Sequence, residues 1–99
     1  MFINHLLITI NYCEDIVKSY NFGMEDKEYL KRLGFKIKIL RKLRNLSQDD
    51  IADKLFIDKS YYSKVERGLT NPTILYLRNL SKVLDISISE LVDSSIKFD

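Results

Sequence analysis

Beyond residue 24, the apolar side chains of this chain recur three or four residues apart and do not alternate singly with polar ones. This spacing lines up one face of an α-helix, whereas a half-buried strand would need strict alternation. A first helix over about residues 26–44 would carry its inward stripe at Leu30, Leu33, Ile37 and Leu40, with Arg41 continuing that face. The pattern predicts a chain built from helices.

Residues that start and stop helices divide the following sequence. Ser47 and Asp50 have the spacing of a capping box, in which a hydroxyl and a carboxylate bind each other's backbone amides, so a second helix begins there. Asn45 before it tolerates the left-handed backbone that ends a helix. Asp58 would cap a third helix over about residues 59–66.

Two further helices complete this pattern. The fourth would follow the Asn-Pro-Thr loop at residues 71–73 and span about 74–84, and the fifth would span about 87–92. The apolar spacing after the first helix predicts these inward-facing residues: Ile51, Ala52, Leu55, Tyr62, Val65, Ile74, Leu77, Leu80 and Leu84. Five short helices with brief connections make an all-α domain whose contacts are mostly local.

Length and composition exclude several classes of protein. At 99 residues the chain is too short for a two-domain enzyme, and its one cysteine, Cys13, cannot form an internal disulfide. Cys13 and the single histidine, His5, cannot supply four zinc ligands, so no metal is expected. Because no nucleophile, carboxylate pair or glycine-rich loop is present to perform chemistry, we expect neither an enzyme nor a cofactor.

The formal net charge is only +2, but the positive charge is local. Residues 24–46 carry eight basic and three acidic side chains. Within them runs a basic series: Lys36, Lys38, Arg41, Lys42 and Arg44. This series could face a polyanion, or it could be a solvated helix face.

Residues 1–23 differ in composition from the rest of the chain. They lack a basic start and a small-residue cleavage site, so they do not resemble an export signal, and their apolar stretch is too short to span a bilayer. Met24 leaves two interpretations open. Residues 1–23 are either an extension to a domain of residues 24–99, or the product of a wrongly assigned start codon.

The first predicted helix carries a second apolar stripe, formed by Phe35, Ile39 and Leu43, roughly opposite its core stripe. A helix that is apolar on two faces needs a second partner. The stripe would pack against the apolar residues of segment 1–12, or it would form part of a dimer contact.

Three motifs then stand in register: Ser-Gln-x-x-Ile-Ala at residues 47–52, Tyr-Tyr-Ser-Lys-Val-Glu-Arg-Gly at 61–68 and Asn-Pro-Thr-Ile-x-x-Leu at 71–77. With them, residues 33–91 resemble the phage-repressor-type (Cro/CI-like, or xenobiotic-response-element) helix-turn-helix family. The resemblance implies a five-helix, lambda-repressor-like DNA-binding domain with a short N-terminal extension. Its third helix would enter the major groove, which is just wide enough for one helix.

The resemblance also implies roles for individual residues. It places four side chains against base edges: Lys59, Ser60, Tyr61 and Lys64. It places four others against the DNA backbone: Ser47, Gln48, Arg67 and Asn71. Since lysine suits the acceptors of guanine, we expect at least one G·C pair in each half-site. Arg41 and Glu66 match the family's ion pair between the first and third helices, so Glu66 would be structural and not a base reader.

The chain departs from the family at positions where glycine is common, held here by Asn45, Phe56 and Asp85. Asparagine and aspartate tolerate a left-handed backbone readily, but phenylalanine does not. The turn at Phe56 could therefore adopt another geometry, with the ring covering the core. Ser81 replaces a small apolar residue, which is tolerable if its hydroxyl binds a carbonyl one turn earlier.

These features predict a cytoplasmic, bacterial or phage-encoded transcriptional regulator, a repressor, with no membrane association. By resemblance, it would bind double-stranded DNA at paired half-sites as a homodimer. Its dimer surface would involve the fifth helix and the tail, although the same residues could equally be core: Ile88, Leu91, Val92, Ile96 and Phe98. The alternative is an antitoxin-like protein that uses the same fold to bind a toxin or another protein, through residues 1–23 or the tail.

Overall fold

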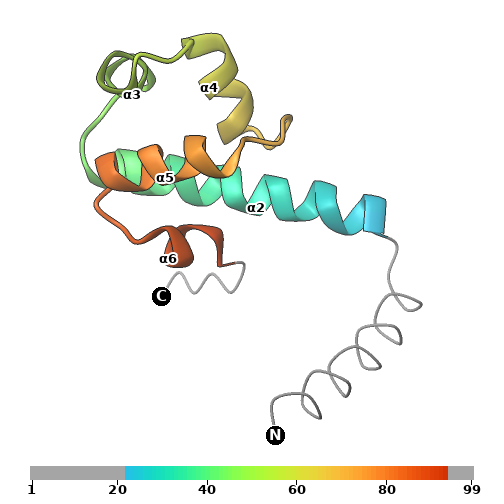
Figure 1. The fold of residues 1–99 in the computed structure, drawn as a ribbon. Coiled ribbons are helices and arrows are strands. Elements are labelled where there is room, and N and C mark those ends of the chain that lie inside the picture. The colour runs from blue at the N-terminus through green and yellow to red at the C-terminus, as the bar shows by residue number, and fades with distance from the viewer. Residues whose placement is uncertain (1–21, 94–99) are drawn as a thin grey trace, which may run out of the picture.

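The computed structural model describes residues 22–93. They form five helices: α2 (Phe22–Leu43), α3 (Gln48–Leu55), α4 (Lys59–Glu66), α5 (Ile74–Val83) and α6 (Ile88–Val92). Figure 1 shows α2 as the long helix in the middle, with α3 and α4 on one side of it and α6 on the other. The α5 helix packs against α3 and α6. Residues 22–93 contain no strand, so the expected all-α fold is confirmed.

Each of the four short helices begins at a side chain that accepts a hydrogen bond from the backbone. Ahead of α3, the Ser47 hydroxyl accepts from the Asp50 amide at 3.0 Å, and the Asp50 carboxylate accepts from the Ser47 amide at 2.7 Å. This pair confirms the predicted capping box. Asp58 caps α4 by accepting from a backbone amide at 2.8 Å, and Thr73 and Ser87 cap α5 and α6.

The three turns at glycine-favouring positions all adopt the left-handed conformation. The φ angle is 57° at Asn45, 54° at Phe56 and 55° at Asp85. The expectation of another geometry at Phe56, with its ring over the core, is wrong, because Phe56 is left-handed and 96% exposed. The next residue, Ile57, packs against the core instead.

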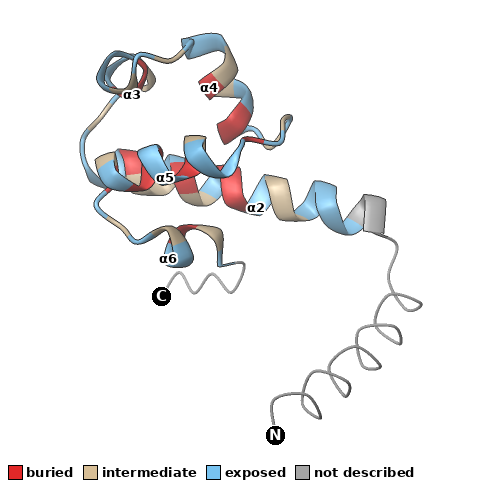
Figure 2. Cartoon of the chain, viewed as in Figure 1, coloured by how far each residue is buried: buried red, intermediate tan, exposed pale blue. Residues whose placement is uncertain are grey.

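One hydrophobic core joins all five helices, and Figure 2 shows its buried positions in red. The cluster consists of Leu33, Ile37, Ile51, Tyr62, Val65, Leu77, Leu80, Leu84 and Leu91. The prediction for Ile74 is wrong: it is the first residue of α5, ahead of the point where the helix reaches the core, and is 65% exposed. Ser81 is buried, and its hydroxyl donates to the Arg78 carbonyl at 2.7 Å, which confirms the expected bond to the preceding turn.

The α6 residues considered for a dimer surface belong to the core. Leu91 is fully buried, and Ile88 and Val92 are partly buried against the same cluster. Ile96 and Phe98 lie outside the described residues. The α6 helix therefore forms part of the domain itself and packs against α2 and α5.

The α2 helix is longer than expected. It begins at Phe22 and not near residue 26, so the expected boundary between residues 23 and 24 falls inside a helix. Its second apolar stripe lies on the outside, where Phe35 is 51% and Leu43 is 72% exposed. The segment 1–12, proposed as a partner for this stripe, lies outside the described residues. Of the helices in residues 22–93, none is long and apolar enough to cross a membrane.

Candidate nucleic-acid interface

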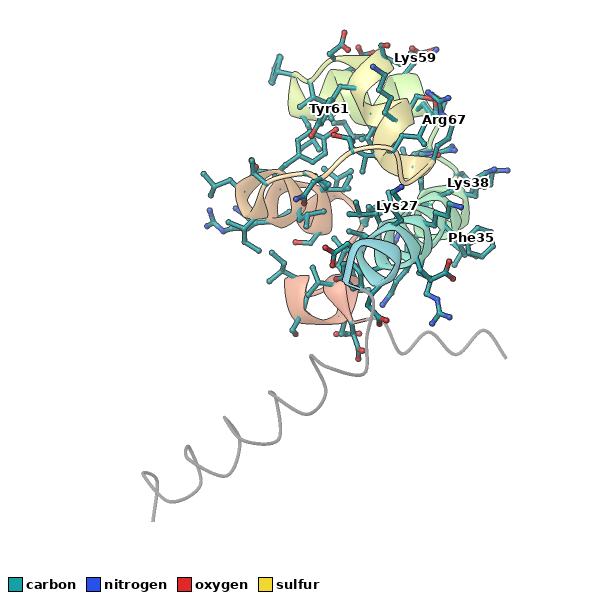
Figure 3. The ribbon with its side chains drawn as sticks, turned by 90° about the vertical axis from the view of Figure 1, so that its right-hand side faces the viewer. Lys27, Phe35, Lys38, Lys59, Tyr61 and Arg67 are labelled. Atoms are coloured by element: carbon teal, nitrogen blue, oxygen red, sulfur yellow. The ribbon has the colours of Figure 1, made fainter. Side chains whose placement is uncertain are left out.

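The α4 helix separates a buried side from a polar side. Tyr62, Val65 and Glu66 point into the domain. Three of the residues expected to meet base edges are exposed on the other side: Lys59, Ser60 and Lys64. Figure 3 shows the Lys59 side chain at the start of α4, on the side of the helix that faces α3 and solvent. The structure thus brings these three polar side chains together on one accessible helix face.

Lys59 already has a partner on the neighbouring helix. Its ammonium group lies 3.0 Å from the carboxylate of Asp49 on α3, and both side chains are more than half exposed. An exposed ion pair of this kind contributes little to stability, so Lys59 can exchange Asp49 for another acceptor at small cost. This contact joins residues ten positions apart across a turn. No helical spacing pointed to it in the sequence.

Tyr61 is more enclosed than its neighbours on α4. It is half-buried, and its ring meets the ring of Tyr76 on α5 edge to face, with 5.3 Å between the ring centroids. The Thr70 hydroxyl donates to the Tyr61 hydroxyl at 3.4 Å. Burial raises the pKa of the Tyr76 phenol, and the nearby Tyr61 and Asp58 raise it further. Tyr61 therefore joins α4 to α5 and offers only part of its ring to solvent.

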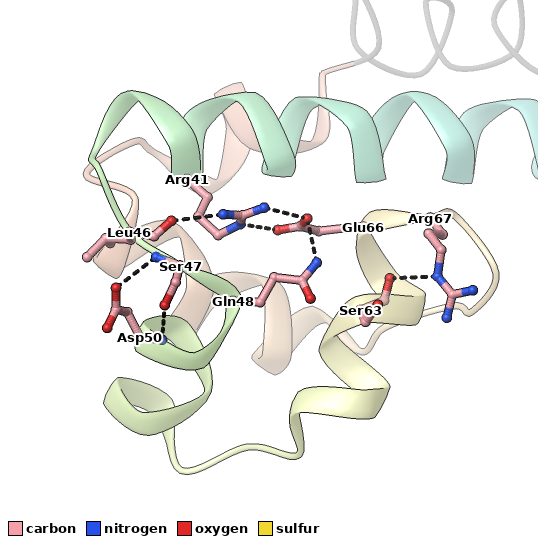
Figure 4. Close-up of polar contacts among 8 residues, drawn as sticks. All are labelled: Arg41, Leu46, Ser47, Gln48, Asp50, Ser63, Glu66 and Arg67. Carbon is pink, nitrogen blue, oxygen red and sulfur yellow. Dashed lines mark hydrogen bonds and ion pairs between the residues drawn. The ribbon is translucent and has the colours of Figure 1, made fainter.

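A buried polar network ties α4 to α2 and α3 (Figure 4). The Arg41 guanidinium donates to both carboxylate oxygens of Glu66, from Nε at 2.6 Å and from Nη2 at 3.1 Å. Its Nη1 donates to the Leu46 carbonyl at 2.8 Å. The Gln48 amide donates to Glu66 at 3.0 Å. The expected contact between Arg41 and Glu66 is present, and the contribution of Gln48 to it is new.

This network sets the charge state of its members. Burial alone raises the pKa of the Glu66 carboxyl, but the hydrogen bonds from Arg41 and Gln48 outweigh burial and lower the pKa below its ordinary value. The hydrogen bond to Glu66 raises the pKa of Arg41, against the opposing effect of burial. Both groups are therefore charged at neutral pH. Together they fix the end of α4 against α2 and the start of α3.

Two glycines allow α4 to end close against α2. A Cβ atom on Gly34 would lie 2.5 Å from the Val65 carbonyl oxygen and closer still to that of Glu66. Gly68, which follows α4 with a φ of 71°, has its α-carbon so near α2 that an added Cβ would lie 2.6 Å from the Lys31 Cα. The end of α4 therefore crosses α2 between Lys31 and Gly34.

The four residues expected at the DNA backbone lie in different settings. Ser47 is exposed, but its hydroxyl serves the capping box. Gln48 is half-buried and bound to Glu66. Arg67 is exposed at the end of α4, where its Nε donates to the Ser63 carbonyl at 3.4 Å. Asn71 is exposed in the loop before α5 and lines a cleft of about 240 Å³ beside the first half of α2.

The structure divides the basic series of residues 36–44, at the end of α2. Lys36 donates to the carbonyls of Glu90 and Asp93 at the end of α6. Arg44 pairs with Asp85 at 3.2 Å. With Arg41 held by Glu66, three of the five cations serve contacts within the domain. Lys38 and Lys42 remain exposed and form no ion pair with any residue in 22–93.

Comparison with known protein families decides the identity of this arrangement. Residues 37–91, more than half of the chain, match the Helix-turn-helix family HTH_3. The chain is a member of this helix-turn-helix family. The match covers about the last third of α2 and the whole of α3, α4 and α5, and it ends within α6.

Relatives of this helix-turn-helix protein include named regulators. The HTH-type transcriptional regulator SinR of Bacillus subtilis strain 168 is 44% identical over 62 residues, which cover 62% of this chain and 56% of SinR. Control protein C.MunI of a Mycoplasma species is 41% identical over 61 residues, or 61% of this chain and 82% of that protein. A crystal structure of SinR in complex with DNA has a TM-score of 0.59 to this fold, covering 62% of this chain and 98% of that chain. The chain thus spans about half the length of SinR.

Proposed function

We propose that this helix-turn-helix chain binds double-stranded DNA sequence-specifically and acts as a transcriptional repressor in the cytoplasm of a bacterial or phage-infected cell. One observation carries the proposal: the exposed face of α4 presents Lys59, Ser60 and Lys64, while the opposite face is fixed in the domain. The similarity to SinR, which has been crystallised with DNA, supports this use of the fold.

The proposed reading of bases follows from the chemistry of the α4 side chains. Lys59 and Lys64 would donate to the N7 and O6 acceptors of guanine, which lie in the major groove. Ser60 can donate or accept and so discriminates little. Tyr61, enclosed by Tyr76, would reach a thymine methyl or a phosphate with the exposed part of its ring.

The proposed backbone contacts position α4 in the groove. The start of α3, at Ser47 and Gln48, offers amide donors and the positive end of a helix dipole to a phosphate. Arg67 and Asn71 would bind phosphates beyond the other end of α4. Glu66 on α4 accepts hydrogen bonds from both Arg41 and Gln48. A phosphate bound at Gln48 would therefore be connected to the recognition helix through these hydrogen bonds.

A homodimer would place two copies of α4 in successive major grooves. Half-sites then lie about 34–36 Å apart, one turn of DNA, and the bound sequence is two-fold symmetric. Because this symmetry is expected whatever bases the operator contains, a random pool of DNA is sufficient to test it.

The test is selection of bound duplexes from a random DNA pool by the full chain. We expect enrichment of a two-fold symmetric site, containing G·C pairs where Lys59 and Lys64 lie. The double variant Lys59→Ala/Lys64→Ala should lose this preference. A matched control, Lys54→Ala/Lys82→Ala, removes the same amount of charge from exposed positions on α3 and α5. This control should keep the sequence preference of the wild type.

Selection of no sequence by the folded chain would contradict the proposal. It would favour the alternative in which the same fold binds a protein partner. Equal loss of preference in the control pair would show that general positive charge, and not α4, directs the binding.

A further inference from the structure

A row of exposed lysines runs along α2 outside the residues assigned to base or backbone contact. It consists of Lys27, Lys31, Lys38 and Lys42, called here the lysine row. At 100° per residue, the four positions fall within about 60° of the helix circumference. None of the four forms an ion pair within residues 22–93. The other α2 cations, in contrast, are paired with acidic groups or carbonyls there.

The lysine row flanks the point where α4 ends. The close approaches at Gly34 and Gly68 place this crossing between Lys31 and Gly34, so Lys27 and Lys31 lie on one side of it and Lys38 and Lys42 on the other. Arg67, the residue after α4, is exposed at the same crossing. Figure 3 shows Lys38 and Arg67 directed to the same side of the molecule.

Charge on the neighbouring helix α3 has the opposite sign. Its sequence, QDDIADKL, carries Asp49, Asp50 and Asp53 against one lysine. The Asp49 and Asp50 carboxylates are held by Lys59 and by the Ser47 amide, so the start of α3 can still accept a phosphate, whereas α2 attracts an anionic ligand along its length. The lysine row spans about 22 Å. A DNA strand places a phosphate about every 3.4 Å along the duplex axis, so several phosphates fall within that length.

We propose that the lysine row, with Arg67, binds the phosphate backbone of the DNA strand that flanks the groove entered by α4. The proposal rests on the proposed function, because it requires the same duplex to be bound by α4. Contacts of this kind carry no base information, so the row adds affinity and lengthens the footprint without changing the sequence that is read.

The test uses variants of the full chain and a random-sequence duplex of about 30 base pairs, for which electrostatic contacts dominate binding. Affinity is measured against salt concentration for wild type and for Lys38→Gln/Lys42→Gln. Each lost phosphate contact lowers the slope of log K against log salt by about 0.9, so the double variant should lose about 2 from the slope. The site recovered by selection should be unchanged.

Two further variants serve as controls. Arg78→Gln/Lys82→Gln removes two exposed cations four residues apart on α5 and should leave the slope at the wild-type value. Lys38→Arg/Lys42→Arg keeps the charge and should also keep the wild-type slope. An unchanged slope in Lys38→Gln/Lys42→Gln, from a wild type that binds the duplex, would overturn the lysine row and leave the proposed function standing. Failure of the wild type to bind any duplex would overturn both.

Discussion

At the scale of single residues, Glu66 links α4 to the rest of the domain. It accepts hydrogen bonds from Arg41 and Gln48, so one carboxylate joins α4 to α2 and α3. Its side chain is almost fully enclosed, and so is that of Arg41. In such a place a charge is tolerated only because a paired group compensates the loss of water.

Replacing Glu66 by glutamine should destabilise the fold in a pH-dependent way. At about pH 7 the change leaves Arg41 without its countercharge and should cost about 3 kcal/mol of unfolding free energy. The folded-state pKa of Glu66 lies below its ordinary value of 4.5. Its charge therefore adds stability above that value, and this stability is lost as the pH falls through the folded-state pKa. Urea unfolding of wild type and Glu66→Gln from about pH 7 to about pH 3 should show the two curves converging in acid.

Two results would contradict this prediction for the Arg41–Glu66 ion pair. Equal stability of wild type and Glu66→Gln at neutral pH would show that the ion pair adds nothing. A difference that persists unchanged into acid would show that the glutamine disturbs packing and not charge.

The motifs allowed part of this chemistry to be predicted. Arg41 and Glu66 stand at family positions, so their pairing could be expected from the sequence. The contacts of Gln48 with Glu66 and of Asp49 with Lys59 could not. They join side chains across turns, where a small change in backbone direction decides which atoms meet.

At the scale of helices and turns, the connection between α3 and α4 holds a phenylalanine in a backbone conformation that suits glycine or asparagine. Phe56 lies in the left-handed region, and its ring contributes almost nothing to the core. For residues other than glycine, asparagine and aspartate, that conformation costs about 1–2 kcal/mol. A residue that is better suited to the left-handed backbone would therefore make the α3–α4 turn more stable.

Phe56→Asn should therefore stabilise the domain. Asparagine tolerates the left-handed backbone, and little packing is lost with the ring, so we expect a gain of about 1 kcal/mol. The midpoint of urea unfolding should rise by a corresponding amount. Phe56→Ala is the matched control, because it removes the ring and keeps an unfavourable side chain at this φ. If asparagine is no more stable than alanine here, the backbone cost is not the cause.

Helix boundaries were predictable where a polar cap follows a clear end of the preceding helix. Ser47, Asp58 and Thr73 each precede a helix in the structure, as their sequence positions indicated. The start of α2 was predicted too late, because Gly23 lies in its first turn and glycine disfavours a helix interior. Ile74 was wrongly placed inside for a different reason: apolar spacing gives the face of a helix but not the residue at which that face first meets the core.

At the scale of the whole molecule, the structure shows which charged side chains form contacts within the domain. In the sequence, the basic series of residues 36–44 looked uniform. In the fold, Lys36 reaches the end of α6 and Arg44 reaches Asp85, whereas Lys38 and Lys42 are exposed to solvent. Their separation depends on contacts between residues about forty to sixty positions apart. Only the packing of the helices supplies that information.

The spacing of half-sites gives the last test of the molecule as a unit. If two copies bind one duplex, an insertion of about five base pairs between the half-sites turns the second one to the opposite face of the DNA. The two copies of the dimer can then no longer bind both half-sites at once. The affinity for the duplex should fall about a hundredfold, to that of a single half-site. The same insertion outside the half-sites should change nothing. Fluorescence anisotropy on the selected site measures all three duplexes, and equal affinities for them would mean that each copy binds alone.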